Sequence, residues 1–156
     1  MTGRKPRGTV TRYYDTGILL KLYTEEEGSD RVRAWVVRRR EAVVFTSLHR
    51  TECVSALRLK AFRGECRLEQ SNAALADLDT DAAAGVLKHT ALEWDEVWER
   101  VEVLARTHAA ATGCRTLDSL HVASALQLGA REMVTRDGRQ AALARKSGLK
   151  VVNPLL

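Results

Sequence analysis

The pattern of apolar and polar positions predicts strands that alternate with helices. Short β-prone or apolar runs, each expected as a strand, lie at 11–14, 42–46, 85–88, 133–135 and 149–152. Between them apolar residues recur at helical spacing, as Val32, Trp35 and Val36 do. This alternation is typical of an α/β fold. We therefore expect a central, mainly parallel sheet with helices on both faces, a three-layer α/β/α sandwich.

The segment 115–137 carries the first candidate chemistry. Asp118 heads a helical row that is otherwise apolar and continues through Val122 and Ala125. Thr116 is expected to cap this helix, which Gly129 ends. Asp137 follows the strand at 133–135. Since ligands bind at the carboxyl ends of strands in open α/β sheets, Asp137 is a candidate ligand-binding residue.

Two further acids occupy comparable positions. Asp15 follows the strand at 11–14 and precedes a helical segment expected over 16–23. Glu52 lies on the helix after the strand at 42–46 and interrupts the apolar row Leu48, Ala56, Leu59. A second apolar row on this helix, at Val54, Leu57 and Ala61, lies nearly opposite the first. A helix that is apolar on two sides is buried or meets another chain.

Four carboxylates gathered in one place would repel one another unless a cation neutralised them. Because all the ligand atoms would be oxygen, the pattern favours a hard ion such as Mg²⁺ or Mn²⁺, which is often shared with substrate phosphates. Such an ion can acidify a bound water and neutralise charge on a phosphate. The pattern thus indicates metal-assisted hydrolysis of a phosphodiester.

Each acid also has a purely structural interpretation. Asp118 could stabilise a helix N-terminus, and Asp137 could form an Asx-turn before Gly138. Asp15 could cap the following helix, and Glu52 could lie on the surface if the helical phase differs. One shared site accounts for all four positions at once, whereas the structural roles require four separate coincidences.

Length and composition set the broad class. With 156 residues, 45% of them hydrophobic and 29% charged, the chain has the composition of one globular domain, expected over 9–156. Residues 1–8 form a basic segment that we expect to be a flexible tail. No apolar run approaches 18 residues and no signal-like leader is visible, so we expect no membrane association and a cytoplasmic location.

The cysteines, histidines and net charge add little chemistry. Three cysteines without CxxC spacing argue against a disulfide framework or a zinc site. The four histidines lack metal-ligand spacing and are expected to be structural, although His121 lies one helical turn from Asp118. The net charge of +5 permits a polyanionic partner without requiring one.

Four segments also carry a family resemblance, in the same order and spacing over essentially the whole chain: 14–23, 46–52, 117–125 and 134–137. In them the chain resembles PIN-domain ribonucleases, and specifically the VapC-type toxins of prokaryotic toxin–antitoxin pairs. The resemblance implies an acidic Mg²⁺ or Mn²⁺ site made by Asp15, Glu52, Asp118 and Asp137, supported by hydroxyls such as Thr16 or Thr135. It also implies RNA cleavage to a 3′-hydroxyl and a 5′-phosphate, homodimerisation, and neutralisation by a cognate antitoxin.

Two other functions remain open at this stage. The chain could be a PIN module that binds RNA or protein without catalysis. It could also be a phosphotransfer domain that uses Asp15, but that class needs a DxD motif or a lysine at a strand end, and Asp15-Thr16-Gly17 supplies neither.

Overall fold

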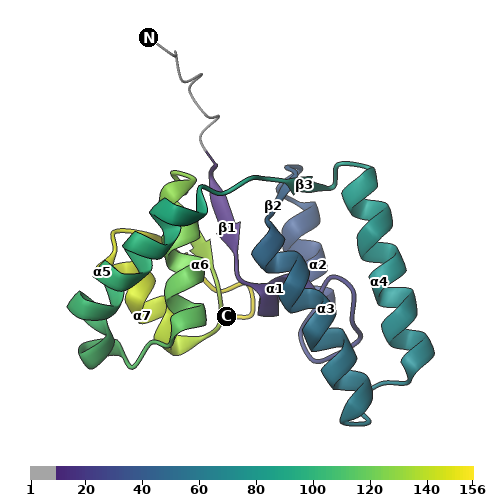
Figure 1. Cartoon of the computed structure of the whole chain (residues 1–156). Coiled ribbons are helices and arrows are strands. Elements are labelled where there is room, and N and C mark those ends of the chain that lie inside the picture. Colours follow the sequence, from purple (N-terminus) through teal and green to yellow (C-terminus); the bar gives the residue numbers. More distant parts are fainter. Residues whose placement is uncertain (1–9) are drawn as a thin grey trace. The chain divides into compact units, whose positions relative to one another are not determined.

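The computed structural model describes residues 10–156, so the predicted tail at 1–8 lies outside the described residues. Seven helices and five strands occupy the described chain (Figure 1). In chain order they are β1 (Arg12–Tyr14), α1 (Thr16–Leu20), α2 (Ser29–Val37), β2 (Val43–Phe45), α3 (Ser47–Phe62), α4 (Leu68–Ala83), β3 (Leu87–His89), α5 (Trp94–Thr112), α6 (Thr116–Gln127), β4 (Glu132–Val134), α7 (Gly138–Lys146) and β5 (Lys150–Val152). The predicted alternation of strands and helices is confirmed.

The strands pair in parallel. β1, β4 and β5 form one sheet in that order, and β2 pairs with β3 so that Val43 lies opposite Leu87. Between β1 and β4, the backbone amide of Glu132 donates to the Thr11 carbonyl, and the backbone amide of Asp15 donates to the Val134 carbonyl. Residue numbers therefore rise in the same direction along both strands, as they do in a parallel ladder. This confirms the predicted α/β class.

The chain divides into two compact units. Within the described residues, unit 1 comprises the segment from residue 10 to Tyr13 together with Leu92–Met133 and Asp137–Val151. Unit 2 comprises Tyr14–Ala91, Val134–Arg136 and Val152–Leu156. The boundary between the units thus falls inside β1, β4 and β5.

Unit 2 is built around a helical hairpin. α3 and α4 pack against each other and lie side by side in Figure 1. Ile18, Phe45, Cys53, Leu57 and Leu78 belong to the core cluster beneath the hairpin. α4 extends to Ala83, and its acidic last turns are anchored from outside the helix. Asp79 pairs with Arg50 at 2.8 Å, and Asp81 accepts a 2.7 Å hydrogen bond from Tyr23.

Unit 1 is mainly helical, with α5, α6 and α7 packed against one another. Leu120 to Ala125 are all buried, including Val122 and Ala125, so the apolar row predicted behind Asp118 is confirmed. The buried Tyr13 hydroxyl lies 2.9 Å from Nδ1 of the buried His121. α6 is thereby bound to β1 within this unit.

No helix in the described part of the chain is long and apolar enough to cross a bilayer.

Candidate functional site

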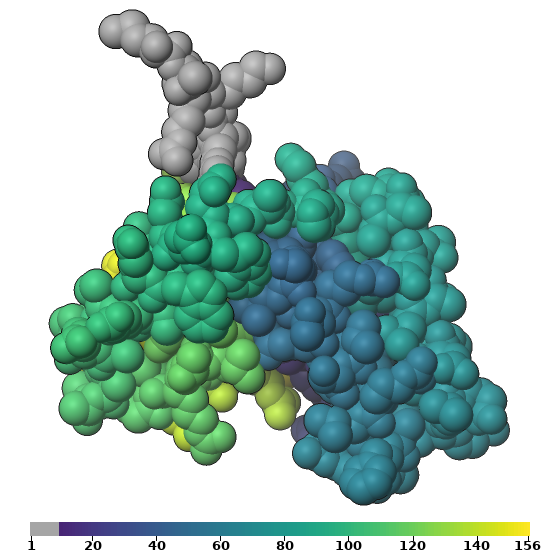
Figure 2. Space-filling model, viewed as in Figure 1, coloured from purple at the N-terminus to yellow at the C-terminus, as the bar shows by residue number. Residues whose placement is uncertain are grey.

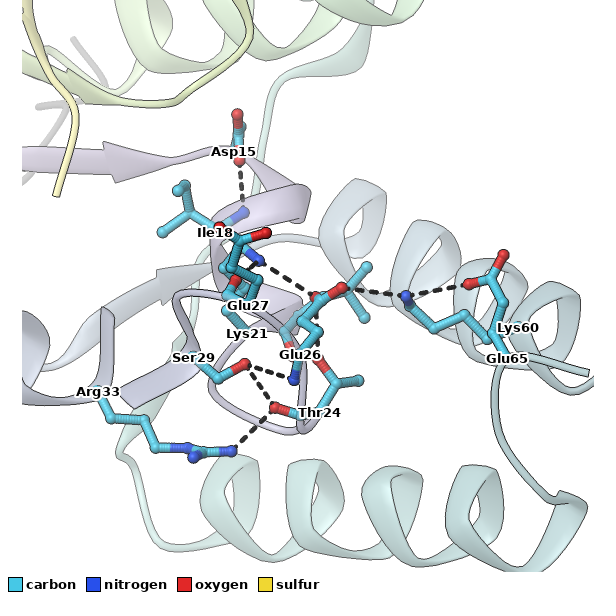
Figure 3. Close-up of polar contacts among 11 residues, drawn as sticks. Asp15, Ile18, Lys21, Thr24, Glu26, Glu27, Ser29, Arg33, Lys60 and Glu65 are labelled. Atoms are coloured by element: carbon cyan, nitrogen blue, oxygen red, sulfur yellow. Dashed lines mark hydrogen bonds and ion pairs between the residues drawn. The ribbon is translucent and has the colours of Figure 1, made fainter. Parts of the chain in front are cut away.

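Asp15 follows β1 and begins α1. It is the N-cap of that helix: Oδ1 accepts a 2.7 Å hydrogen bond from the Ile18 amide (Figure 3). Its other carboxylate oxygen, Oδ2, accepts a short hydrogen bond from the Thr135 hydroxyl. The structural role expected for Asp15 is therefore present, but the carboxylate is also buried. A buried carboxylate held at both oxygens is fixed in orientation.

Glu52 lies on the second turn of α3 and is partly buried. Its Oε1 accepts a 2.9 Å hydrogen bond from the hydroxyl of Thr16, the residue that follows Asp15. The structure therefore brings Asp15, Thr16, Glu52 and Thr135 together within unit 2. The two hydroxyls named from the family resemblance each donate to one of the two acids.

His49 contributes to the same region, a role that the sequence did not indicate. Its ring is fully buried one helical turn before Glu52, with Nε2 2.7 Å from the Tyr14 carbonyl and Nδ1 3.0 Å from the Thr46 amide nitrogen. Thr46 is the N-cap of α3 and His49 the third residue of a capping box. The sequence contains the spacing of a capping box, in which Thr46 is followed three residues later by a side chain that can accept a hydrogen bond. That spacing is hard to recognise here because His49 replaces the usual Glu or Gln.

The C-terminal end of α1 is followed by a loop held by charges (Figure 3). Lys21 is buried and donates to the Glu27 carbonyl at 2.6 Å, and its ammonium lies 3.6 Å from Glu26. Glu26 in turn pairs with Lys60 of α3 at 3.2 Å, and Lys60 also pairs with Glu65 at 3.4 Å. These pairs connect the helix that begins at Asp15 with the C-terminal half of α3. The amides of Lys21, Leu22 and Tyr23 donate to carbonyls three residues earlier, so α1 ends before the predicted Tyr23.

The other two acids lie in unit 1. Asp118 is the third residue of α6, where its Oδ2 accepts a 2.8 Å hydrogen bond from the Arg115 amide. Arg115, and not the predicted Thr116, is thus the N-cap residue of α6. Asp137 is the N-cap of α7 and accepts hydrogen bonds from the Arg139 and Gln140 amides, both at 2.9 Å. Both acids are partly buried. Asp118 lies at a helix N-terminus, as its structural interpretation has it, and Asp137 accepts from the amide two residues on, as in the expected Asx-turn, and also caps α7.

Burial and charge around Glu52 also change a neighbouring thiol. Cys53 is fully buried, and this burial, followed by the charge of Glu52, raises the pKa of its thiol to about 12. The group therefore stays a neutral thiol at physiological pH. All three cysteines are free, as the sequence indicates.

The donor set suits a hard cation. Within residues 10–156, no three His, Cys, Asp or Glu side chains gather in a way that could hold a metal ion by themselves. Mg²⁺, however, is commonly bound through one or two carboxylates, and waters and substrate phosphates complete its shell. The Ile18 amide and the Thr135 hydroxyl orient the Asp15 carboxylate, and both Asp15 and Glu52 present oxygen atoms, the ligands that Mg²⁺ prefers. Asp15 and Glu52 therefore fit such a partial ligand set.

A pocket of about 400 Å³ lies elsewhere in unit 2, between the loop after α1 and the α3–α4 hairpin. Neither Asp15 nor Glu52 lines it. Its charged walls include Glu26, Lys60 and Glu65, which already pair with one another. The pocket is therefore separate from the acidic pair.

Known proteins resemble the chain in family and in fold. The PIN domain family model matches residues 12–146. Among solved structures, FitAcB from Neisseria gonorrhoeae superposes with a TM-score of 0.60 at 18% identity, over 92% of this chain and 98% of that one. DNA-bound VapBC from Salmonella typhimurium superposes with a TM-score of 0.64 at 15% identity, over 93% of this chain and 98% of that one. No curated protein matches the sequence.

Proposed function

The chain belongs to the PIN-domain family, and from that premise we propose that it is a metal-dependent endoribonuclease of the VapC toxin type. The observation that carries the proposal is the Asp15–Glu52 pair. Two acids distant in sequence are held in one unit by the hydroxyls of Thr135 and Thr16. Holding acidic side chains by hydrogen bonds in fixed orientations is how proteins prepare a metal site.

In this proposal Asp15 and Glu52 hold Mg²⁺ or Mn²⁺. When bound, the ion supplies an acidified water and neutralises charge on the phosphate. The protein's own contribution is orientation. Thr135 and the Ile18 amide fix the Asp15 carboxylate, and Thr16 fixes that of Glu52. Orientation of this kind matters because displacement of a reacting group by about 1 Å can cost roughly 100-fold in rate.

Asp118 and Asp137 belong to the same proposal through the family resemblance. Both lie at helix N-termini, where backbone amides hold their carboxylates in place. We propose that they complete the catalytic acidic set, and mutation of each tests this role. Loss of cleavage in Asp118→Asn and Asp137→Asn, with an intact fold, supports it; cleavage at the wild-type rate removes that residue from the set.

The proposed partners are RNA, a cognate antitoxin and a second copy of the chain. The sequence resembles VapC-type toxins, and VapBC is among the similar structures. Apolar side chains are exposed around the end of the α3–α4 hairpin: Leu59, Phe62 and Leu68 are 47%, 87% and 55% exposed. Figure 2 shows these helices, in blue and teal, at the surface. Exposed apolar residues of this kind favour a protein partner. A cytoplasmic location, where RNA is accessible, accompanies the proposal.

The test is RNA cleavage by the purified chain with Mn²⁺ or Mg²⁺. Asp15→Asn and Glu52→Gln should each lower the rate by about 100-fold or more, because each removes charge from the acidic pair. Asp30→Asn is the matched control, since Asp30 is an exposed acid in the same unit. Sequencing of the RNA ends should reveal 5′-phosphates.

Two outcomes would contradict the proposed function. Wild-type protein that binds RNA but leaves it intact with either ion would make the chain a non-catalytic PIN module. Cleavage that persists in both variants would show that these acids are not the catalytic groups.

A further inference from the structure

His49 reaches the peptide group that joins Tyr14 to Asp15. Its Nε2 lies 2.7 Å from the Tyr14 carbonyl oxygen, across 35 residues of sequence. The amide at the other end of the same peptide, that of Asp15, donates to the Val134 carbonyl at 3.0 Å. Because a peptide group is planar, these two hydrogen bonds fix the plane from which the Asp15 side chain projects.

The hydrogen-bond partners of the neutral His49 ring determine its tautomer. The Thr46 amide can only donate, and it lies 3.0 Å from Nδ1, so Nδ1 is the acceptor. In the neutral ring the proton is then on Nε2, which donates to the Tyr14 carbonyl. His49 thus uses one nitrogen to cap α3 and the other to hold the end of β1. Its ring also stacks on Phe45 with a centroid separation of 6.0 Å, which limits its rotation.

His49 and Glu52 are three residues apart on α3, so they lie on the same side of the helix. The helix that carries Glu52 is therefore attached, through His49, to the peptide that carries Asp15. The hydrogen bond from Thr16 to Glu52 is a second connection between the same segments. Two connections define the relative placement of two carboxylates better than one.

We propose that His49 is a positioning residue that sets the placement of the Glu52 carboxylate relative to that of Asp15. It touches neither RNA nor metal and acts through the Tyr14–Asp15 peptide. The proposal rests on the proposed function, because it assigns to these two acids a common ligand.

Two near-isosteric substitutions separate the two hydrogen bonds of the ring. In His49→Gln the amide nitrogen takes the place of Nε2 and can still donate to the Tyr14 carbonyl, and the amide oxygen is the acceptor that a capping box usually has at this position. In His49→Asn the amide oxygen takes the place of Nδ1 and can still accept from Thr46, while the donor to Tyr14 is lost. Both variants thus keep an acceptor for the Thr46 amide, and only His49→Asn loses the donor to the Tyr14 carbonyl.

We expect His49→Asn to weaken Mn²⁺ binding and slow RNA cleavage by about 10- to 100-fold, the usual effect of removing a group that orients a ligand. The KM for RNA should stay near the wild-type value. His49→Gln should stay within about threefold of wild type in both properties. A role confined to capping α3 predicts instead that both variants stay near wild type, because Asn and Gln each offer an oxygen that can accept from the Thr46 amide. Mn²⁺ binding is measured by calorimetry at matched folded fraction.

A measurement without metal separates this inference from the proposed function. Amide hydrogen exchange at Asp15 should accelerate in His49→Asn and stay near wild type in His49→Gln. If wild type neither binds Mn²⁺ nor cuts RNA but exchange at Asp15 follows this order, the proposed function fails and the positioning of the peptide stands. If exchange at Asp15 and Mn²⁺ binding are unchanged in His49→Asn, the positioning role is overturned.

Discussion

Asp15 combines a helix cap with a second hydrogen bond that orients its carboxylate. As an N-cap it satisfies the Ile18 amide, and as a buried carboxylate it also accepts from Thr135. The capping bond fixes one oxygen, and the hydroxyl fixes the other. A structural role and a role in the site are therefore compatible for this residue, since the same bonds that stabilise α1 also orient the acid.

Gly28 offers a test of local structure at a single residue. Its φ of 85° lies in the left-handed region, and a Cβ there would come within 2.7 Å of Leu155 Cδ2. Gly28→Ala should lower the free energy of unfolding by about 1–2 kcal/mol, because a left-handed conformation is strained for alanine. The leucine side chain can rotate away, so strain in the backbone supplies most of the effect. Urea denaturation measures the difference.

Gly138→Ala is the matched control. Gly138 is the first residue of α7, has no positive φ, and a Cβ there meets no atom within 4 Å. Alanine should leave stability unchanged or raise it by up to about 1 kcal/mol. Equal destabilisation by the two substitutions would contradict this interpretation of Gly28.

The positions of the acids could be predicted at this scale, but their partners could not. Strand ends and interrupted apolar rows indicated Asp15 and Glu52 directly. The contact between His49 and the Tyr14 carbonyl joins residues 35 positions apart, and no local pattern encodes it. The two threonine hydroxyls were named only because of the family resemblance.

At the scale of elements, the loop between α1 and α2 is held by alternating charges. Glu26 lies between Lys21 and Lys60, and Lys60 lies between Glu26 and Glu65. Partial burial raises the pKa of Glu26, but the hydrogen bond and charge of Lys60 outweigh it, so the net pKa of Glu26 is lowered. Burial likewise lowers the pKa of Lys60, but Glu26 and Glu65 outweigh it and raise the pKa.

These two pKa shifts make the stability of the fold depend on pH, through Glu26 in the acidic range and through Lys60 in the alkaline range. Glu26, with a lowered pKa, stabilises the fold above its unfolded-state pKa, and that contribution is lost as pH falls through its folded-state value. Lys60, with a raised pKa, stabilises the fold below the unfolded-state pKa of lysine, and that contribution is lost as pH rises through its folded-state value. Glu26→Gln should therefore reduce the loss of stability on acidification from about pH 6 to about pH 3. Urea denaturation at several pH values measures this change.

Glu27→Gln is the control for this prediction. Glu27 is the next residue and is exposed, and in the described chain its contact is through the backbone carbonyl that accepts from Lys21. It should retain the acid sensitivity of wild type. Identical pH profiles for wild type and Glu26→Gln would contradict the role assigned to these ion pairs.

The order and type of the elements followed from apolar periodicity, whereas several ends did not. α1 ends at Leu20 because the following amides bond to carbonyls three residues back. α4 continues through the acidic run because Arg50 and Tyr23 satisfy Asp79 and Asp81. Both ends depend on contacts with other elements or on turn geometry, which a single periodic pattern does not contain.

At the scale of the whole molecule, the chain is a PIN domain whose predicted acids are divided between two compact units. Asp15 and Glu52 belong to unit 2, and Asp118 and Asp137 belong to unit 1. The family match at 12–146 runs through segments of both. Sequence reasoning predicted the class of fold and the acid positions, and unit 2 shows how one pair of acids is held.

Binding of Mn²⁺ to the purified chain, measured by calorimetry, tests the central claim most directly. Wild type should bind the ion, and Asp15→Asn combined with Glu52→Gln should weaken binding by at least about 10-fold, while Asp30→Asn should bind as wild type does. Wild-type affinity in the double variant would contradict the claim that these two carboxylates hold the metal.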